Sequence, residues 1–169
     1  MILVTDPRPS GHELFLRSGG QTGVDRAALD VALDLGVRCG GWCPAGRRAE
    51  DGRISDRYPL LELPGAGYRQ RTCRNVLDSD GTVIFHFAGP SGGTRHTLED
   101  CRRSTKPCLL IDAAVLTPRE AVTRLDLFVR ESLIADLNVA GPRASEEESA
   151  YGYAQAALRL YLRANMPNP

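Results

Sequence analysis

A glycine-rich turn at residues 18–26 separates an apolar run from a helical pattern. The turn reads Ser-Gly-Gly-Gln-Thr-Gly-Val-Asp-Arg and follows Leu14-Phe15-Leu16, a short predicted strand. Behind the turn, apolar side chains recur at the spacing of one helix face, at Val24, Ala27, Ala28, Val31 and Leu35. Gly36 is then placed to end that helix. The chain is thus predicted to pass from a strand into a helix through a few glycines.

The same turn has the composition of an anion site. Gly19, Gly20 and Gly23 allow a tight backbone turn and leave room for a ligand to approach the main chain. Thr22 and Asp25 are predicted to form a capping box at the helix start, where free N–H groups and the helix dipole favour a phosphate. The glycine spacing differs from both G-x-G-x-x-G and the lysine-bearing phosphate loop. A strand–helix turn without a ligand therefore remains the alternative.

Strand and helix patterns alternate along the rest of the chain. Predicted strands occupy residues 13–17, 37–44, 58–64, 82–87, 107–111 and 137–140. Further helices are predicted at 68–77, at 95–104 behind a Thr94 cap, behind the capping box of Thr117 and Glu120, and behind a cap at Ser145. This alternation predicts an α/β fold with a mostly parallel sheet. We expect one domain at residues 13–164, a loose arm at 1–12 and a frayed tail at 165–169.

The composition of three predicted strands indicates whether each lies inside the sheet or at its edge. Residues 82–87 and 107–111 are apolar runs, which predicts strands buried in the sheet. Residues 58–64 contain prolines, which predicts a strand at the sheet edge. The long polar loop at 45–57 lies between the predicted strands 37–44 and 58–64. Loops of that length are often functional, and a solvated surface loop is the alternative.

A second glycine turn, at residues 89–94, follows the buried strand 82–87 and repeats the first pattern. Ligands of parallel α/β sheets bind outside the carboxyl ends of the strands, where both turns are expected to lie. The loops beginning at Trp42 and at Asn138 emerge at the same edge. The candidate binding residues are Gly19, Gly20, Gln21, Thr22, Gly23, Trp42, Arg47, Arg48, Gly92, Gly93, Thr94, Asn138, Gly141 and Arg143.

These residue types suit an oxyanion attached to a flat organic ring. Gln21, Thr22 and Thr94 can donate hydrogen bonds to the oxyanion, and the candidate arginines can add charge-assisted contacts. Trp42 can stack on the ring, with a core or interface position as the alternative. His96 is expected to be structural rather than catalytic, and Asp25 is accounted for as a capping residue. No metal-ligand spacing and no Ser/His/Asp or Cys/His grouping stands out.

Composition narrows the function classes further. The 169 residues contain 42% hydrophobic and 25% charged residues with a net charge of zero, so no global basic field predicts binding to nucleic acid or to an anionic membrane. The five cysteines are odd in number and include no Cys-x-x-Cys pair, which leaves a metal or redox role for Cys39 and Cys43 disfavoured and predicts Cys101 and Cys108 as core residues. We expect no signal peptide or membrane span, and a reduced cytoplasmic location.

The motifs at residues 19–26, 41–52, 71–82 and 92–97, and the segment Leu137-Asn138-Val139-Ala140-Gly141-Pro142-Arg143, resemble the molybdenum cofactor carrier proteins. The resemblance extends over nearly all of the chain from Leu14. It implies a Rossmann-like three-layer fold and a homo-oligomer, a tetramer or a dimer. It also implies non-covalent binding of the molybdenum cofactor, a pterin with a phosphate, as cargo that is passed on to molybdenum enzymes.

A wider resemblance defines the alternative functions. Residues 89–97 are similar to the Pro-Gly-Gly-x-Gly-Thr-x-x-Glu motif of the lysine-decarboxylase-like phosphoribohydrolases, which cleave nucleoside monophosphates. The catalytic glutamate of that motif falls on Thr97, which cannot act as a general acid or base. Glu99 lies two residues on, about 200° around a helix. A binding protein is favoured, with a nucleotide sensor and a nucleotide N-glycosidase as the alternatives, and with a nucleotide or an oxyanion as the alternative ligand.

Overall fold

The computed structural model describes residues 13–166, so the predicted arm at 1–12 and the end of the predicted tail lie outside the described residues. Helices and strands alternate as the sequence predicts. The elements are β1 (Phe15–Arg17), α1 (Val24–Leu35), β2 (Cys39–Pro44), β3 (Arg48–Ala49), β4 (Gly52–Arg53), β5 (Leu60–Leu63), α2 (Tyr68–Asp78), β6 (Gly81–His86), α3 (Gly92–Arg103), β7 (Cys108–Asp112), α4 (Pro118–Glu131), β8 (Asp136–Ala140) and α5 (Ala150–Asn165). The last helix therefore reaches the first residue of the predicted tail.

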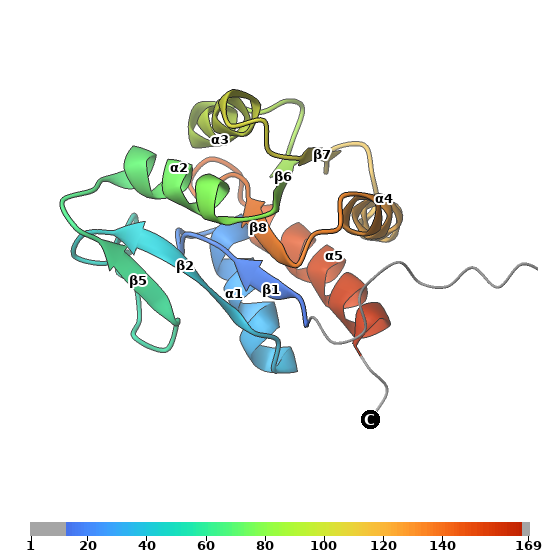
Figure 1. Ribbon diagram of the computed structural model, residues 1–169, viewed down its shortest axis with the longest axis horizontal. Helices are drawn as coiled ribbons and strands as arrows, with labels where there is room; N and C mark the ends of the chain where they lie inside the picture. The colour runs from blue at the N-terminus through green and yellow to red at the C-terminus, as the bar shows by residue number, and fades with distance from the viewer. Residues whose placement is uncertain (1–12, 167–169) are drawn as a thin grey trace, which may run out of the picture.

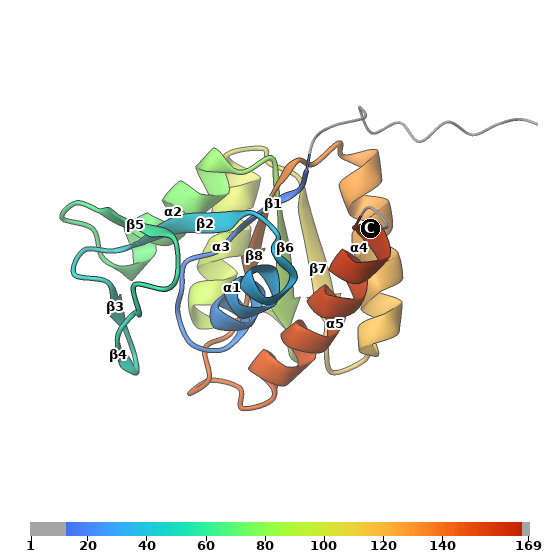
Figure 2. The same ribbon diagram turned by 90° about the horizontal axis from the view of Figure 1, so that it is seen from below.

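Six strands form one parallel sheet in the order β5-β2-β1-β8-β6-β7. Helices α1, α4 and α5 cover one face of the sheet, and α2 and α3 cover the other (Figures 1 and 2). The expected α/β, Rossmann-like three-layer arrangement is thereby confirmed. The last strand, β8, inserts between β1 and β6 and joins the N-terminal and C-terminal halves of the sheet.

The burial of each strand follows from its place in that order. All six residues of β6 are buried, as its apolar sequence predicts, because helices cover both of its faces. Strand β5 lies at one edge, which confirms the prediction from its prolines. The prediction for residues 107–111 is wrong: β7 forms the opposite edge, and only Ile111 among its residues is fully buried.

Helix starts were predicted with mixed success. The capping box of Thr117 and Glu120 is present at α4, with Pro118 in the first turn. The other three predicted caps are wrong. Helix α1 is capped by the backbone of Gly23 at a φ of 77° rather than by the Thr22 side chain, α3 begins at Gly92 so that Thr94 lies inside its first turn, and α5 begins after Ser149 rather than Ser145.

The long loop at 45–57 is ordered by a small core of its own. It contains the hairpin β3–β4 and packs against α1 and β2 through a cluster of buried side chains: Leu29, Cys43, Ala49, Ile54, Tyr58 and Leu60. The main core lies on the other side of α1, where Leu16, Phe85 and Leu137 of the sheet meet α1, α4 and α5.

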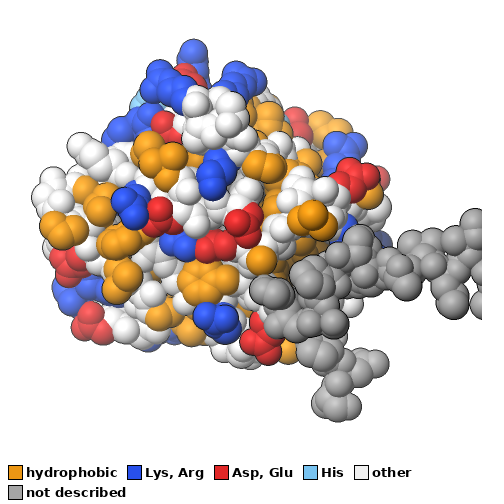
Figure 3. Space-filling model, viewed as in Figure 1, with side chains coloured by type: hydrophobic (Ala, Val, Ile, Leu, Met, Phe, Trp, Pro, Cys, Tyr) orange, Lys and Arg blue, Asp and Glu red, His pale blue; other side chains and the backbone are white. Residues whose placement is uncertain are grey.

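On the face drawn in Figure 3, acidic, basic and hydrophobic side chains are interspersed. That mixture agrees with the net charge of zero of the sequence. Within residues 13–166, none of the helices is both long enough and apolar enough to cross a membrane.

Candidate functional site

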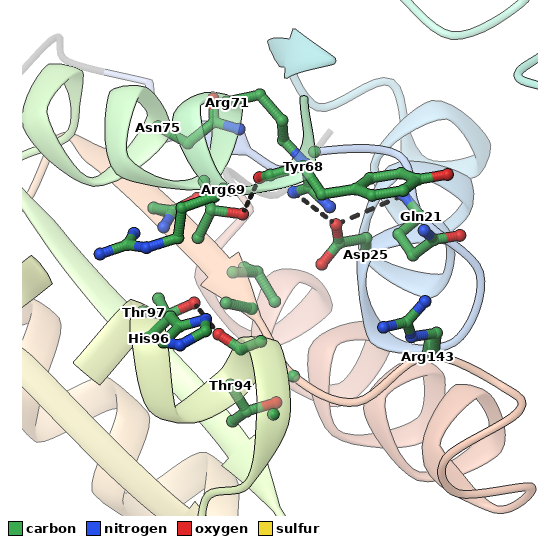
Figure 4. Close-up of a pocket in the computed structure, with 18 of the residues that line it drawn as sticks. Gln21, Asp25, Tyr68, Arg69, Arg71, Asn75, Thr94, His96, Thr97 and Arg143 are labelled. Atoms are coloured by element: carbon green, nitrogen blue, oxygen red, sulfur yellow. Dashed lines mark hydrogen bonds and ion pairs between the residues drawn. The ribbon is translucent and has the colours of Figure 1, made fainter. Parts of the chain in front are cut away.

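A pocket of about 360 Å³ opens at the carboxyl ends of β1 and β8. Helix α2 forms one wall and the first turns of α3 form the other (Figure 4). This is the edge of a parallel sheet where ligands bind, and the volume lies within the range of small-molecule sites. The pocket is lined by Gly19, Gln21, Asp25, Tyr68, Arg69, Arg71, Thr72, Asn75, Gly92, Gly93, Thr94, His96, Thr97, Asn138, Val139, Ala140, Gly141, Arg143 and Glu146.

A buried ion pair between Asp25 and Arg71 lies at one end of the pocket. Arg71 Nη1 donates to Asp25 Oδ2 at 3.0 Å, and the backbone N–H of Gln21 donates to the same oxygen at 3.3 Å. Burial raises the pKa of Asp25, an effect that the Arg71 charge and these hydrogen bonds oppose. Arg71 Nε is buried and has no hydrogen-bond partner among the described residues. The pair thus offers both a carboxylate and an unused N–H donor.

Gly19 makes room for this pair. A Cβ atom at Gly19 would lie 1.6 Å from Arg71 Nη1, so any side chain there would displace the guanidinium. Gly19 is therefore required by the protein's own arginine, whatever it also does for a ligand.

Several N–H groups of the first glycine turn are used within the protein. Besides the Gln21–Asp25 bond, the Thr22 N–H donates to Gln21 Oε1 at 3.0 Å and the Val24 N–H donates to the Pro142 carbonyl at 3.2 Å. The Asp25 carboxylate thus accepts a hydrogen bond from the turn at which the sequence predicts an external anion. The N–H groups of Gln21, Thr22 and Val24 are therefore engaged within the protein.

The start of α3 has the features of an anion site instead. Its cap residue, Ser91, makes no side-chain cap bond, and Gly92 and Gly93 are exposed. The first N–H groups of a helix have no partner within the helix, and they carry the positive end of its dipole. Thr94 is only 4% exposed, and its hydroxyl has no partner in the described part of the chain. One turn later, the Thr97 hydroxyl donates to the Gly93 carbonyl at 3.0 Å.

Charged and aromatic side chains surround the pocket mouth. Arg69 of α2 pairs with the buried Asp100 of α3 and thereby ties the two walls together. Arg143 Nε donates to Glu146 Oε1 at 3.2 Å. Tyr68, 43% exposed, presents its ring near the Asp25 end of the pocket (Figure 4).

Eight of the fourteen candidate binding residues line this pocket: Gly19, Gln21, Gly92, Gly93, Thr94, Asn138, Gly141 and Arg143. Three others belong to the first turn but lie outside the lining. The Gly20 carbonyl accepts hydrogen bonds from Arg26, and the Thr22 hydroxyl donates to Glu50. A Cβ atom at Gly23 would lie 2.3 Å from the Pro142 carbonyl oxygen, so this glycine permits close backbone packing.

The structure places Arg47, Arg48 and Trp42 away from the pocket. Arg47 is 7% exposed and donates to the carbonyls of four residues at 2.8–3.1 Å: Ile54, Ser55, Tyr58 and Leu60. It therefore holds the long loop closed instead of facing a ligand. Arg48 is exposed on β3 and donates to the Ala45 carbonyl.

Trp42 is already engaged by side chains of α2. Its Nε1 donates to Asp78 Oδ2 at 2.8 Å, and the Arg74 guanidinium lies 5.5 Å from the centre of its ring. The Asn75 amide also bonds the Trp42 main chain, at 2.8 and 2.9 Å, which fixes α2 on β2. The ring is thus stacked by a residue of the protein.

Helix α2 contributes pocket residues that are not among the sequence-based predictions. Tyr68, Arg71, Thr72 and Asn75 share one face of the helix, because Arg71 and Thr72 each stand three or four residues from both Tyr68 and Asn75. That polar face points at the pocket, and a polar stripe on the inner side of a predicted helix was the signal available for it. Asp25 was interpreted only as a cap, although it is a buried pocket carboxylate.

The cysteines do not belong to a group arranged to hold a metal ion in the described part of the chain. Among residues 13–166, no group of three or more His, Cys, Asp or Glu side chains is arranged to hold a metal ion. Burial raises the pKa of the Cys39 and Cys43 thiols, which lowers their reactivity. Cys101 is buried in the core, as predicted, whereas Cys108 on the edge strand is half-buried.

Comparison with known proteins gives one family and one solved structure. The model of the circularly permutated YpsA SLOG family, cpYpsA, matches residues 16–162. A crystal structure from Syntrophus aciditrophicus SB, of a protein named "putative molybdenum carrier protein", is 40% identical and superposes with a TM-score of 0.87, over 89% of this chain and 96% of that one. No curated protein matches.

Proposed function

The chain belongs to the circularly permutated YpsA SLOG family, the family of molybdenum carrier proteins that its sequence resembles, and on that basis we propose that it carries the molybdenum cofactor non-covalently in the pocket between α2 and α3. The cofactor is a pterin with a phosphate, and it is the cargo rather than a resident group. The name of the Syntrophus aciditrophicus protein supports a carrier role, and the pocket chemistry supports the kind of cargo.

The observation that carries this proposal is a pair of buried polar atoms, Arg71 Nε and Thr94 Oγ1, that have no hydrogen-bond partner within residues 13–166. Both residues line the pocket, and buried polar groups are otherwise almost always hydrogen-bonded. They belong to opposite walls, so a ligand with a polar group at each end fits them better than a small ion does. In this arrangement the phosphate lies at the start of α3, near Arg143, and the pterin lies toward Asp25 and Tyr68.

Each pocket residue then has a binding role. The α3 N–H groups and the Thr94 hydroxyl donate to the phosphate, and Arg143 adds a charge-assisted bond. The Asp25–Arg71 pair binds polar atoms of the ring edge, and the Tyr68 ring stacks on its face. No step in this scheme breaks a covalent bond, so the cargo is released unchanged.

A nucleotide N-glycosidase is the second candidate, and the placement of Asp25 favours it. This carboxylate is 5% exposed, lines the pocket and has a pKa raised by burial, which are properties of a general acid or base. Against it, Arg71 stabilises the ionised form of Asp25, and Thr97 stands where the related hydrolases have their glutamate. Release of ribose 5-phosphate from AMP or GMP, lost on Asp25→Asn, would establish this alternative.

Thermal shift of the purified protein tests the carrier proposal. The panel is the molybdenum cofactor under anaerobic conditions, molybdate, tungstate, AMP, ATP, NAD and inorganic phosphate. A ligand at one hundred times its Kd stabilises a protein by about 2.7 kcal/mol, so a true ligand gives a clear shift. We expect the cofactor to stabilise the protein far more than phosphate does. Stabilisation by a nucleotide alone would refute the proposal.

Matched arginine variants locate the binding site. Arg143→Ala removes a pocket cation and is expected to weaken cofactor binding about tenfold. Arg48→Ala removes the same charge from an exposed position outside the pocket and should leave the affinity unchanged. Equal effects of the two variants would mean that only the overall charge matters.

We also propose that the protein forms a homo-oligomer, a dimer or a tetramer, and that it transfers the cargo to molybdenum enzymes. The molar mass in solution tests the oligomeric state.

A further inference from the structure

The start of α3 lies beside a negative charge of the protein itself. Glu146, on the loop between β8 and α5, lines the same pocket as Gly92, Gly93 and Thr94. A Cβ atom added to Gly92 would lie 3.1 Å from Glu146 Oε1. A carboxylate this close to the first residue of a helix is attracted by the helix dipole and by the N–H groups that have no partner within the helix.

Arg143, the cation nearest to this helix start, is engaged by the same Glu146 carboxylate. Arg143 Nε donates to Glu146 Oε1 at 3.2 Å and lies 4.0 Å from Glu50 Oε2. The Glu146 backbone N–H in turn donates to the Arg143 carbonyl at 3.0 Å. The arginine that would bind an external anion therefore has its charge balanced by carboxylates of its own loop and of the β3–β4 hairpin.

The anion site is nevertheless not satisfied by Glu146. The Thr94 hydroxyl, on an almost fully buried side chain that lines the pocket, has no partner among residues 13–166. This unused hydroxyl is an observation independent of the helix end, and it indicates that the site is built for one more acceptor than Glu146 supplies. The Glu146 side chain is 32% exposed and belongs to a surface loop, so it can move aside.

We propose that Glu146 is a built-in competitor for the anion site at the start of α3. Resting on the carrier function proposed above, this inference assigns Glu146 to the regulation of cargo binding. An incoming phosphate group displaces the Glu146 carboxylate from the helix end and from Arg143, and it alone also reaches the Thr94 hydroxyl. Affinity is then lower than the pocket contacts would give, and the carboxylate can return to the site when the cargo leaves.

Neutralising Glu146 is the test. Glu146→Gln keeps the shape of the side chain and removes the competing charge, so inorganic phosphate and the molybdenum cofactor should each bind about three- to tenfold more tightly. Glu148→Gln is the matched control, since Glu148 is exposed on the same loop and lies outside the pocket lining. Titration calorimetry gives the Kd values, and circular dichroism confirms that all three proteins are folded.

The outcomes separate this inference from the carrier proposal. Tighter binding by Glu146→Gln, but not by Glu148→Gln, supports the competitor role. Phosphate binding that is measurable in Glu146→Gln and in neither of the other two proteins also supports it. Unchanged or weaker binding by Glu146→Gln, or an equal gain by Glu148→Gln, would overturn it while cofactor binding by the wild-type protein keeps the carrier function. Failure of the wild type and of Glu146→Gln to bind either probe would overturn both.

Discussion

Two threonines one turn apart on α3 give opposite predictions for the same substitution. Thr94 and Thr97 are 4% and 3% exposed, and valine matches the shape of both. The Thr97 hydroxyl donates to the Gly93 carbonyl, whereas the Thr94 hydroxyl has no partner in the described chain. Leaving a buried hydroxyl unsatisfied costs about 1–3 kcal/mol, and a satisfied bond contributes about 1 kcal/mol.

Thr94→Val should therefore stabilise the ligand-free protein by about 1 kcal/mol, and Thr97→Val should destabilise it by about 1 kcal/mol. In a chain of this length each change moves Tm by about 2–4 °C, in opposite directions. Thr94→Val should also weaken binding of a phosphorylated cargo about tenfold or more, because a hydrogen bond to a charged group contributes about 1.5–3 kcal/mol.

Thermal unfolding of the two variants without ligand, followed by titration with the molybdenum cofactor, measures both effects. Destabilisation by Thr94→Val equal to that by Thr97→Val would refute the argument, because the Thr94 hydroxyl would then be satisfied in the free protein. A more stable Thr94→Val protein with unchanged affinity would instead show that the hydroxyl does not contact the cargo.

Three further substitutions test how the pocket and its loops are built. Arg47→Ala should lower the free energy of unfolding, measured in urea, by about 3 kcal/mol, because four carbonyls lose their donor. The cargo affinity of the folded fraction should be unchanged. Weaker binding without destabilisation would contradict this structural role of Arg47. Gly19→Ala should cost about 3–5 kcal/mol in the same assay by separating Arg71 from its carboxylate, and a change below 1 kcal/mol would mean that the guanidinium moves aside freely. Burial and the Asp30 carboxylate raise the pKa of Tyr58 from 10.0 to about 12, so the folded protein keeps this proton between pH 10 and 12 while the unfolded chain loses it, and stability falls as pH rises through that window. Ultraviolet titration should show the pKa of Tyr58 moving toward 10 in Asp30→Asn, and an unmoved pKa would leave burial as its sole cause.

The local sequence determined most of the secondary structure. Residues 117–120 carry a complete capping box with a proline in the first turn, and α4 begins there. Residues 82–87 are apolar at nearly every position, and β6 is buried on both faces. The two glycine turns follow strands and precede helices, so their place at the carboxyl edge of a parallel sheet follows from chain direction alone. Five of the predicted binding residues, Gly19, Gln21, Gly92, Gly93 and Thr94, belong to these turns and line the pocket.

The hydrogen bonds of the first glycine turn depend on contacts between distant parts of the chain. The pair of Asp25 and Arg71 joins residues 46 positions apart, and it converts a predicted capping residue into a pocket carboxylate whose hydrogen bonds use the turn that was expected to hold an anion. Arg47 and Trp42 have the composition of ligand contacts, yet the carbonyls of the long loop and the side chains of α2 engage them first.

The physical reason is the range of the interactions. Helix periodicity, capping and glycine conformations depend on residues within about one turn of each other, and a sequence displays those neighbours directly. A guanidinium or an indole N–H pairs with whichever acceptor the fold brings near, and the packing of α1, α2 and the long loop supplies those acceptors. The elements and the sheet edge at which the pocket lies thus follow from local sequence patterns, whereas contacts between distant parts of the chain set which polar groups remain free to bind a ligand.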